Sequence, residues 1–443
     1  MRWLVLFHRY AGIVLGILMA LWCLSGLVMM YVGYPELERA ERLRALPSLD
    51  LHACCVLPDD AQIASFQLEM LAGRPVGRLG SRLIDLSNAE PIDAVTPQQA
   101  QAVAAAPSPG VLLDYDQWTV AVRGRPLYRF ALADTAGTEV YVSQRTGRIV
   151  QTTTARQRFW NWLGAVPHWL YFAQLRHNAR GWTQIVVWTS FAGCCLAATG
   201  IWLGVQRFLH RPAGRWSPYR GLMLWHHVPG FIAGVFALTW VASGLISMNP
   251  WGFLDSSDDG VPSPGTVASA QLREALAHLP RQGNWVSVDS SLFDGQLYLI
   301  AATSSGQRTR FDTQGMPHPL TASDVKKLTG TDAELLMSED PYYFSHHRDI
   351  VPLPVYRVIL EDAGHTRYYI DPVSGAFLRR VDGNSRWYRW LHQGLHRMDF
   401  TPALRQRPLW DVVMWVLMSA VATISCTGAV LGIRRLLGQK RYV

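Results

Sequence analysis

The stretch HRYAGIVLGILMALWCLSGL, residues 8–27, decides the fold, because it is apolar along nearly its whole length and carries a single charged residue, Arg9. Uncharged sequence continues from there to residue 34, and three further stretches lack Asp, Glu, Lys and Arg: residues 185–205, 228–254 and 412–433. Each is as long as the roughly 20 residues that a helix needs to cross a bilayer core. The sequence therefore predicts four transmembrane helices and excludes a soluble enzyme.

The charges outside these stretches predict the orientation of the chain. All 33 Asp and Glu residues lie in the two long segments 35–181 and 255–411. The termini and the loop between the second and third stretches hold only basic charges: Arg2, Arg9, Arg207, Arg211, Arg215, Arg220, Arg434, Arg435, Lys440 and Arg441. Positively charged short segments stay in the cytoplasm, so we expect both termini inside and both long segments outside. The net charge of +8 then reflects topology and lipid contact, not nucleic-acid binding.

The second half of the chain repeats the first. Residues 126–207 placed on residues 354–435, a shift of 228 without a gap, give 20 identities in 82 positions, against roughly one in fifteen by chance. A shift of 218 places residues 8–27 on HHVPGFIAGVFALTWVASGL at residues 226–245. Because both halves begin and end in the cytoplasm, we expect a parallel duplication with a pseudo-two-fold axis along the membrane normal. Equivalent residues would then lie at equal depth.

The two external segments predict small units that mix helix and strand. Residues 96–106 and 321–328 each begin with Thr, a preferred helix cap, and predict short helices. Two pairs of segments alternate apolar and polar side chains on either side of a turn, as β-hairpins do. They are residues 126–133 with 139–150, and residues 355–361 with 366–378.

Several of these motifs resemble a known family. YVSQRTGRIV at residues 141–150 and YYIDPVSGAFL at residues 368–378 resemble strands of PepSY domains. The opening stretch, LPVYR at residues 353–357 and WLHQGLHRMDF at residues 390–400 resemble the PepSY-associated transmembrane family. The resemblance implies a ferric-siderophore reductase of the bacterial inner membrane that carries b-type haems.

The predicted fold is an α-helical membrane protein with four transmembrane helices, a parallel internal duplication and two small periplasmic α+β PepSY-like domains. The expected elements are transmembrane helices at residues 8–34, 182–206, 222–250 and 409–434, PepSY-like domains at residues 35–155 and 251–383, interfacial helices at residues 156–181 and 384–408, and a cytoplasmic loop at residues 207–221.

Four histidines are kept by the repeat and are the candidate haem ligands. His8 corresponds to His226, and both lie at cytoplasmic span ends; His168 corresponds to His396, and both precede a span on the external side. Two histidines can bind the same haem iron only if they lie at the same depth in the membrane. We therefore predict two bis-histidine haems, bound by His8 with His226 and by His168 with His396, with irons on the order of 20 Å apart across a core of about 30 Å.

Glycines accompany the first of these pairs. A flat porphyrin can press its edge on bare glycine backbone while an imidazole nitrogen reaches the iron. The alternative is that small residues at this spacing only let helices pack closely, with the histidine at headgroup depth. Two symmetric copies favour the haem. The glycines at helical spacing are Gly12 and Gly16 after His8, and Gly230 and Gly234 after His226.

Three further histidines occur in the second half alone. His392 lies one turn before His396, but its repeat partner is Gly164, so it is a candidate for a supporting residue or an alternative ligand. His346 and His347, in YYFSHHRD at residues 342–349, are candidates for the electron exit or for ligands of the external haem. An equally good interpretation is that these two residues are ordinary histidines of an external loop.

The predicted activity is reduction of a periplasmic ferric siderophore, with release of Fe(II), by electrons carried across the membrane. No C-x-x-C-H motif is present, so the haems would be non-covalent haem b. No nucleotide-binding motif is present either, so a separate cytoplasmic reductase or quinol would donate the electrons. We assign no catalytic residue. The alternative is a non-enzymatic PepSY module that binds or inhibits an envelope protease or another partner.

Overall fold

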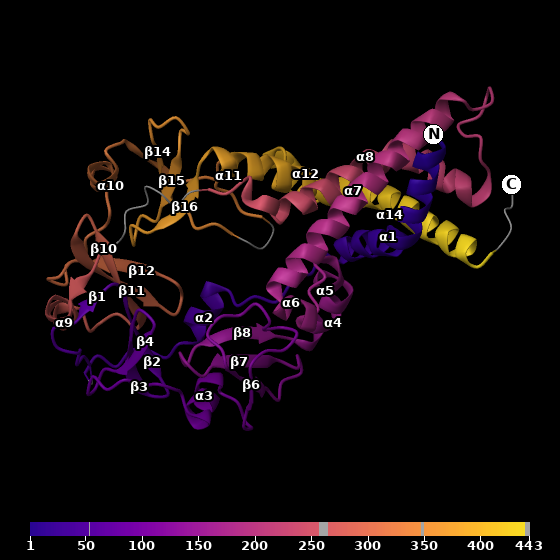
Figure 1. Cartoon of the computed structure of the whole chain (residues 1–443). Coiled ribbons are helices and arrows are strands. Elements are labelled where there is room, and N and C mark those ends of the chain that lie inside the picture. Colours follow the sequence, from indigo (N-terminus) through magenta and orange to yellow (C-terminus); the bar gives the residue numbers. More distant parts are fainter. Residues whose placement is uncertain (53, 257–264, 347–349, 439–443) are drawn as a thin grey trace. The chain divides into compact units, whose positions relative to one another are not determined.

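The chain folds into two compact units. The computed structural model describes residues 1–52, 54–256, 265–346 and 350–438. The membrane unit consists of Met1–Tyr34, Arg156–Asp255 and Asn384–Val443, and the sheet unit consists of Pro35–Ala155 and Ser256–Gly383 (Figure 1). Each unit thus combines segments from both halves of the sequence.

Four long helices form the membrane unit and are apolar enough to span a bilayer, so the chain is a membrane protein. They are α1 (Arg2–Met29), α7 (Ala179–Leu209), α8 (Gly221–Ser247) and α14 (Leu409–Leu436). The first span was expected at residues 8–34, but the helix begins at Arg2 and ends at Met29. The chain leaves the helix ahead of Gly33 and Pro35, because both residue types disfavour a helix interior.

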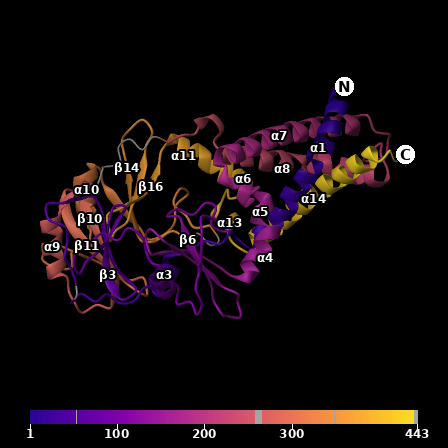
Figure 2. The ribbon, with the colours of Figure 1, turned by 60° about the horizontal axis from the view of Figure 1, so that its bottom comes forward.

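The four helices form a ring. Each of α1 and α8 packs against both α7 and α14, so α1 and α8 lie opposite each other in the ring. Figure 2 shows the four long helices gathered in one bundle. Small residues permit the close approach. A Cβ at Gly16 would lie 3.4 Å from the Cα of Ala429, and one at Gly234 would lie 2.9 Å from Cγ1 of Ile201. Gly16 and Gly234, two of the four glycines predicted to contact a porphyrin, therefore serve helix packing.

Short helices precede α7 and α14 where the sequence analysis expected one interfacial helix each, so that expectation was wrong. Residues 156–181 form α4 (Ala155–Leu163), α5 (Ala165–His168) and α6 (Ala173–His177). Residues 384–408 form α11 (Gly383–Tyr388), the π-helix η2 (Arg389–Gly394), α12 (Leu395–Arg397) and α13 (Pro402–Arg405). The chain turns at Leu170 (φ 51°) and Met398 (φ 55°), which the repeat pairs and whose left-handed conformation ends a helix.

A six-stranded antiparallel sheet lies at the centre of the sheet unit and takes three strands from each external segment. Its order is β12-β11-β10-β2-β3-β4. The strands are β2 (Phe66–Leu71), β3 (Arg74–Leu79), β4 (Arg82–Asp85), β10 (Trp285–Phe293), β11 (Gln296–Thr303) and β12 (Arg308–Phe311). A second link between the segments is the pair β1 (Gln62–Ile63) and β9 (Val267–Ala268). The two predicted domains are therefore joined by shared strands, which the sequence analysis did not foresee.

The central strand pair has the geometry of a two-fold relation. The turn residues Ala72 and Asp294, which follow β2 and β10, are 222 positions apart. Gln67 and Asp289 are also 222 positions apart, and they are direct partners in the β2–β10 ladder. The axis of a two-fold rotation that exchanges β2 with β10 therefore passes through this residue pair.

Two four-stranded sheets flank the central one. Their orders are β5-β6-β7-β8 and β13-β14-β15-β16. The strands are β5 (Val111–Leu113), β6 (Leu127–Ala131), β7 (Glu139–Ser143), β8 (Ile149–Thr153), β13 (Ala333–Leu336), β14 (Val355–Ile359), β15 (Arg367–Ile370) and β16 (Phe377–Val381). The expected helices are confirmed as α3 (Pro97–Ala104) and α10 (Ala322–Thr329), and each is capped by the predicted Thr. Helices α2 (Arg39–Ala45) and α9 (Ser269–His278) and the 3-10 turn η1 (Pro250–Gly252) complete the described elements.

Both predicted hairpins form, but each second strand is shorter than expected. Residues 139–150 and 366–378 contain a further turn, at Gly147 (φ 64°) and Gly375 (φ 72°). Both turns need glycine for a second reason, since a Cβ would lie 2.5 Å from Leu71 Cδ1 or 2.4 Å from Phe293 Cδ2. Leu71 and Phe293 end β2 and β10, so each flanking sheet packs on the central sheet through an equivalent contact.

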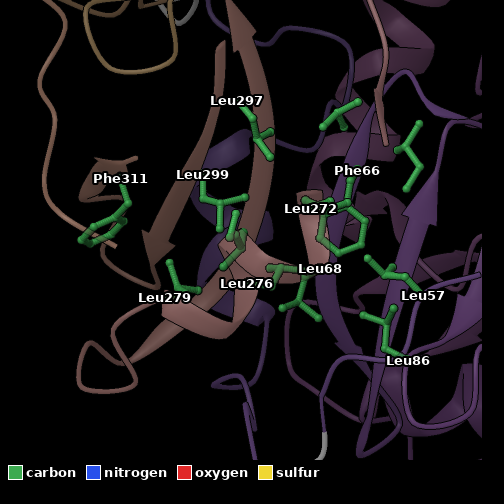
Figure 3. Close-up of a cluster of buried hydrophobic side chains, with 14 of the residues drawn as sticks. Leu57, Phe66, Leu68, Leu86, Leu272, Leu276, Leu279, Leu297, Leu299 and Phe311 are labelled. Carbon is green, nitrogen blue, oxygen red and sulfur yellow. The ribbon is translucent and has the colours of Figure 1, made fainter. Parts of the chain in front are cut away.

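Leucine and phenylalanine side chains from both external segments fill one core. Figure 3 shows Phe66 and Leu68 of β2 together with Leu272 and Leu276 of α9 and Leu299 of β11. All five are buried. The adjacent Cys54 and Cys55, joined by a disulfide, pack against this core. The sheet unit is therefore a single folded body to which both halves of the chain contribute.

One buried carboxylate is surrounded by arginines. Glu69 of β2 is 1% exposed and lies 3.1 Å from Arg148, 3.2 Å from Arg78 and 3.5 Å from Arg42. Burial alone would raise the pKa of Glu69, but the three guanidinium groups outweigh it and hold the pKa below its ordinary value. A charge so enclosed depends on its partners, because an unpaired buried charge is strongly unfavourable.

Replacing Glu69 by Gln should lower the thermal unfolding temperature of the sheet unit, because breaking a buried ion pair costs about 3–5 kcal/mol. Asp59→Asn is the control, since Asp59 pairs with Arg273 on the exposed surface and should change little. The depressed pKa makes the Glu69 contribution complete above the unfolded-state pKa of about 4.3. The difference between parent and variant should therefore shrink as the pH falls through the folded-state pKa. An equal loss in both variants would contradict this role for Glu69.

Candidate functional site

The structure brings the four repeated histidines together in the predicted pairs. His8 of α1 and His226 of α8 face each other across the helix ring, with ring centroids 6.3 Å apart. His168 of α5 and His396 of α12 face each other with ring centroids 6.2 Å apart. In each pair, one histidine comes from each half of the chain.

The two pairs lie at different levels of the bundle. Cε1 of His168 is 3.4 Å from where a Cβ would stand at Gly26 of α1. Gly26 follows His8 on the same helix by 18 residues, which is about 27 Å at a rise of 1.5 Å per residue. The His396 ring lies against Gly244 of α8 in the same way. One pair is therefore near each end of the membrane unit.

Backbone carbonyls hold the first pair. His8 Nδ1 lies 3.1 Å from the carbonyl oxygen of Leu196 on α7, and His226 Nδ1 lies 3.0 Å from that of Ile424 on α14. A carbonyl only accepts hydrogen bonds, so Nδ1 carries the proton in each ring and Nε2 carries a lone pair. Neutral imidazoles with this tautomer are ready metal ligands.

The second pair is held in the same manner. His168 Nδ1 donates to the carbonyl of Trp22 at 3.0 Å, and His396 Nδ1 donates to that of Trp240 at 3.2 Å. The hydroxyls of Ser25 and Ser243, which the repeat pairs, lie 3.3 and 3.0 Å from the same nitrogens. All four imidazoles are therefore oriented by a neighbouring helix and share one tautomer.

Glycines make room for the first two rings. A Cβ at Gly200 would lie 2.7 Å from His8 Cε1, and one at Gly428 would lie 3.0 Å from His226 Cε1. The predicted glycines Gly12 and Gly230 have a single neighbouring atom each, at 3.8 and 3.9 Å. Sequence reasoning missed Gly200 and Gly428, although both stand at identical positions of the repeat.

Two tryptophans fix the backbone next to the second pair. The Trp182 indole donates to the carbonyl of Trp169 at 2.9 Å, and the Trp410 indole donates to that of Arg397 at 2.8 Å. Trp169 and Arg397 directly follow His168 and His396 in the sequence. Trp410 is buried.

The donor set fits a haem at each level. Two imidazoles that bind one iron from opposite sides at about 2 Å place their ring centroids about 6 Å apart, as observed in both pairs. In the described part of the chain no group of three or more His, Cys, Asp or Glu could hold a bare metal ion. Two imidazoles instead suit an iron whose other four ligands come from a porphyrin.

Unmet hydrogen-bonding capacity beside the second pair also fits a bound group. The indole nitrogens of Trp22 and Trp240 are buried and find no acceptor among the described residues. A buried donor without an acceptor costs about 1–3 kcal/mol. The missing acceptor thus recurs at two positions that the repeat pairs. Each of the four imidazoles also keeps part of its surface uncovered by protein.

The remaining candidate histidines separate into two groups. His392 of η2 lies beside the second pair, with its ring centroid 5.3 Å from that of His396. His346 lies in the sheet unit, between β13 and β14. His347 lies outside the described residues. The membrane unit therefore contains five of the candidate histidines.

Comparison with known protein families gives one match, to the PepSY-associated TM region, over residues 5–323. The matched range begins in α1 and ends in α10, so it covers three of the four spans. No curated protein matches the chain. Because the match covers well over half of the sequence, the chain belongs to the PepSY-associated transmembrane family.

Proposed function

We propose that this chain is a di-haem b reductase of the bacterial inner membrane that passes electrons across the bilayer to a periplasmic ferric siderophore and releases Fe(II). One observation carries the proposal: two facing histidine pairs, near opposite ends of the bundle, whose rings all present Nε2 with a lone pair. The basic termini and cytoplasmic loop, and the confinement of all 33 acidic residues to the two long segments, support the orientation.

In this proposal, the histidines bind the haems and their carbonyl partners orient the imidazole rings. His8 with His226, and His168 with His396, would hold the two haems, and bound haem supplies reversible one-electron transfer. The carbonyls of Leu196, Ile424, Trp22 and Trp240 keep the rings in the tautomer that ligation needs. Two axial imidazoles leave no open position, which suits electron transfer rather than oxygen binding.

The proposed substrate class rests on the resemblance noted in the sequence analysis and on the chemistry of iron. Hard oxygen ligands of a siderophore hold Fe(III) tightly, and one electron converts it to Fe(II), which they hold weakly. The siderophore is thereby released intact. A separate donor, either a cytoplasmic reductase or quinol, supplies the electron, because the sequence contains no nucleotide-binding motif.

The purified protein should contain two haems b per chain, fully extractable with acidic organic solvent. His8→Ala and His226→Ala should remove the same haem, and His168→Ala should remove the other. Difference spectra and the haem-to-protein ratio measure both effects. His52→Ala, which alters a histidine of the sheet unit, should keep both haems. Loss of different haems from the His8 and His226 variants would contradict the pairing.

Gly200→Ala and Gly428→Ala should each weaken binding of the His8–His226 haem, because the new Cβ displaces an imidazole from its carbonyl partner. Changes to groups that orient a metal ligand typically cost about 10–100-fold in affinity. Haem titration of the depleted protein measures the effect. Gly364→Ala in the sheet unit is the control, since its Cβ would meet only atoms at 3.4 Å or farther. Equal affinity in all three variants would remove these glycines from the site.

Reduced protein mixed with a ferric hydroxamate should reoxidise, and a ferrous-iron trap should colour at the same rate. His168→Ala should abolish both signals while the His8–His226 haem stays reducible, because the electron would lose its path to the external side. Stopped-flow absorbance at the haem and trap bands follows both. Reduction of the chelate at the parental rate by this variant would refute the proposed route.

A further inference from the structure

A third imidazole stands beside the second pair. The ring centroids of His392 and His396 are 5.3 Å apart, with planes tilted by 35°. His392 Nδ1 lies 3.0 Å from the carbonyl of Ser243, and His396 Nδ1 lies 3.2 Å from that of Trp240. Both rings therefore donate hydrogen bonds to carbonyls of α8. The two carbonyls are three residues apart, which is about 4.5 Å along the helix.

His392 meets the same chemical requirements as the four paired histidines. Its hydrogen bond to a carbonyl places the proton on Nδ1 and leaves a lone pair on Nε2. Nε2 is the nitrogen that a carbonyl-anchored histidine offers to a metal. The α12 side of the second site thus has two imidazoles able to bind iron, whereas the α5 side has His168.

The first half of the chain has no room for such a residue. The repeat partner of His392 is Gly164, where a Cβ would lie 3.0 Å from Val28 Cγ1 and 3.2 Å from the carbonyl oxygen of Trp160. A side chain of imidazole size would need the backbone or Val28 to move. The asymmetry between the two sides of the site is therefore built into the packing.

The backbone that carries His392 departs from regular α-helix. His392 lies in the π-helix η2, which is followed directly by α12 with His396. Single π-turns are uncommon and occur frequently at functional sites. Sliding this segment by one helical turn, about 5.4 Å, is a known kind of switching motion. A step of that size would carry His392 toward the position of His396, whose ring centroid lies 5.3 Å away.

We propose that His392 is a second axial ligand of the site, able to bind the iron opposite His168 in place of His396. The proposal rests on the proposed function, since it requires a haem at this level. Exchange of one neutral imidazole for another leaves the charge and the coordination number unchanged. The iron therefore stays low-spin with either ligand, and its spectrum and midpoint potential report which histidine is bound.

The test compares His392→Ala, His396→Ala and the double variant with the parent, each as the full-length protein in detergent. We expect two haems per chain in both single variants and one in the double variant. His396→Ala should remain low-spin, with a shifted low-spin signal in electron paramagnetic resonance and a shifted midpoint potential. His168→Ala should lose the haem, because position 164, the repeat partner of His392, is glycine.

The His8–His226 haem serves as the internal control for folding, since its signal should be unchanged in every variant. A His396→Ala protein with one haem, or with a high-spin second haem, would overturn the proposal while leaving the di-haem reductase intact. A parent protein without haem would overturn the proposed function and this inference together.

Discussion

The hydrogen bond between an imidazole Nδ1 and a carbonyl on a neighbouring helix is the interaction on which the rest of the membrane unit depends. A helical carbonyl already accepts an N–H from its own helix, but its oxygen has a second lone pair. It is also fixed by the backbone, so its position is as exact as the packing of the helices. The arrangement of His8, His226, His168 and His396 therefore reflects how the spans approach one another.

That dependence explains why small residues lie where they do. Gly200 and Gly428 place bare backbone beside the two rings near the N-terminal ends of α1 and α8. Gly16 brings α1 close to Ala429 of α14, and Gly234 brings α8 close to Ile201 of α7. Glycines in these spans thus serve two separate purposes, ring clearance and helix contact, at positions only a few turns apart.

The spans could be predicted because each is a long uncharged run in the sequence. The histidine pairs could be predicted because their members recur at fixed offsets between the two halves. Sequence reasoning missed Gly200 because a repeated glycine does not reveal which ring lies on it. It ran β7 and β8 together because the turn at Gly147 interrupts the alternation for only a few residues. It could not foresee the Gln67–Asp289 partnership, since strand pairing across more than 200 residues depends on the folded arrangement and not on a local pattern.

Each level of the membrane unit takes one histidine from each half, and the central sheet takes three strands from each half. Neither half therefore contains a complete site or a complete sheet. In each histidine pair and in the central sheet, the two halves of the chain contribute as the two subunits of a homodimer would. Because the two halves form one chain, positions 164 and 392 can carry different residues, Gly and His, on the two sides of one histidine pair, which identical subunits cannot do.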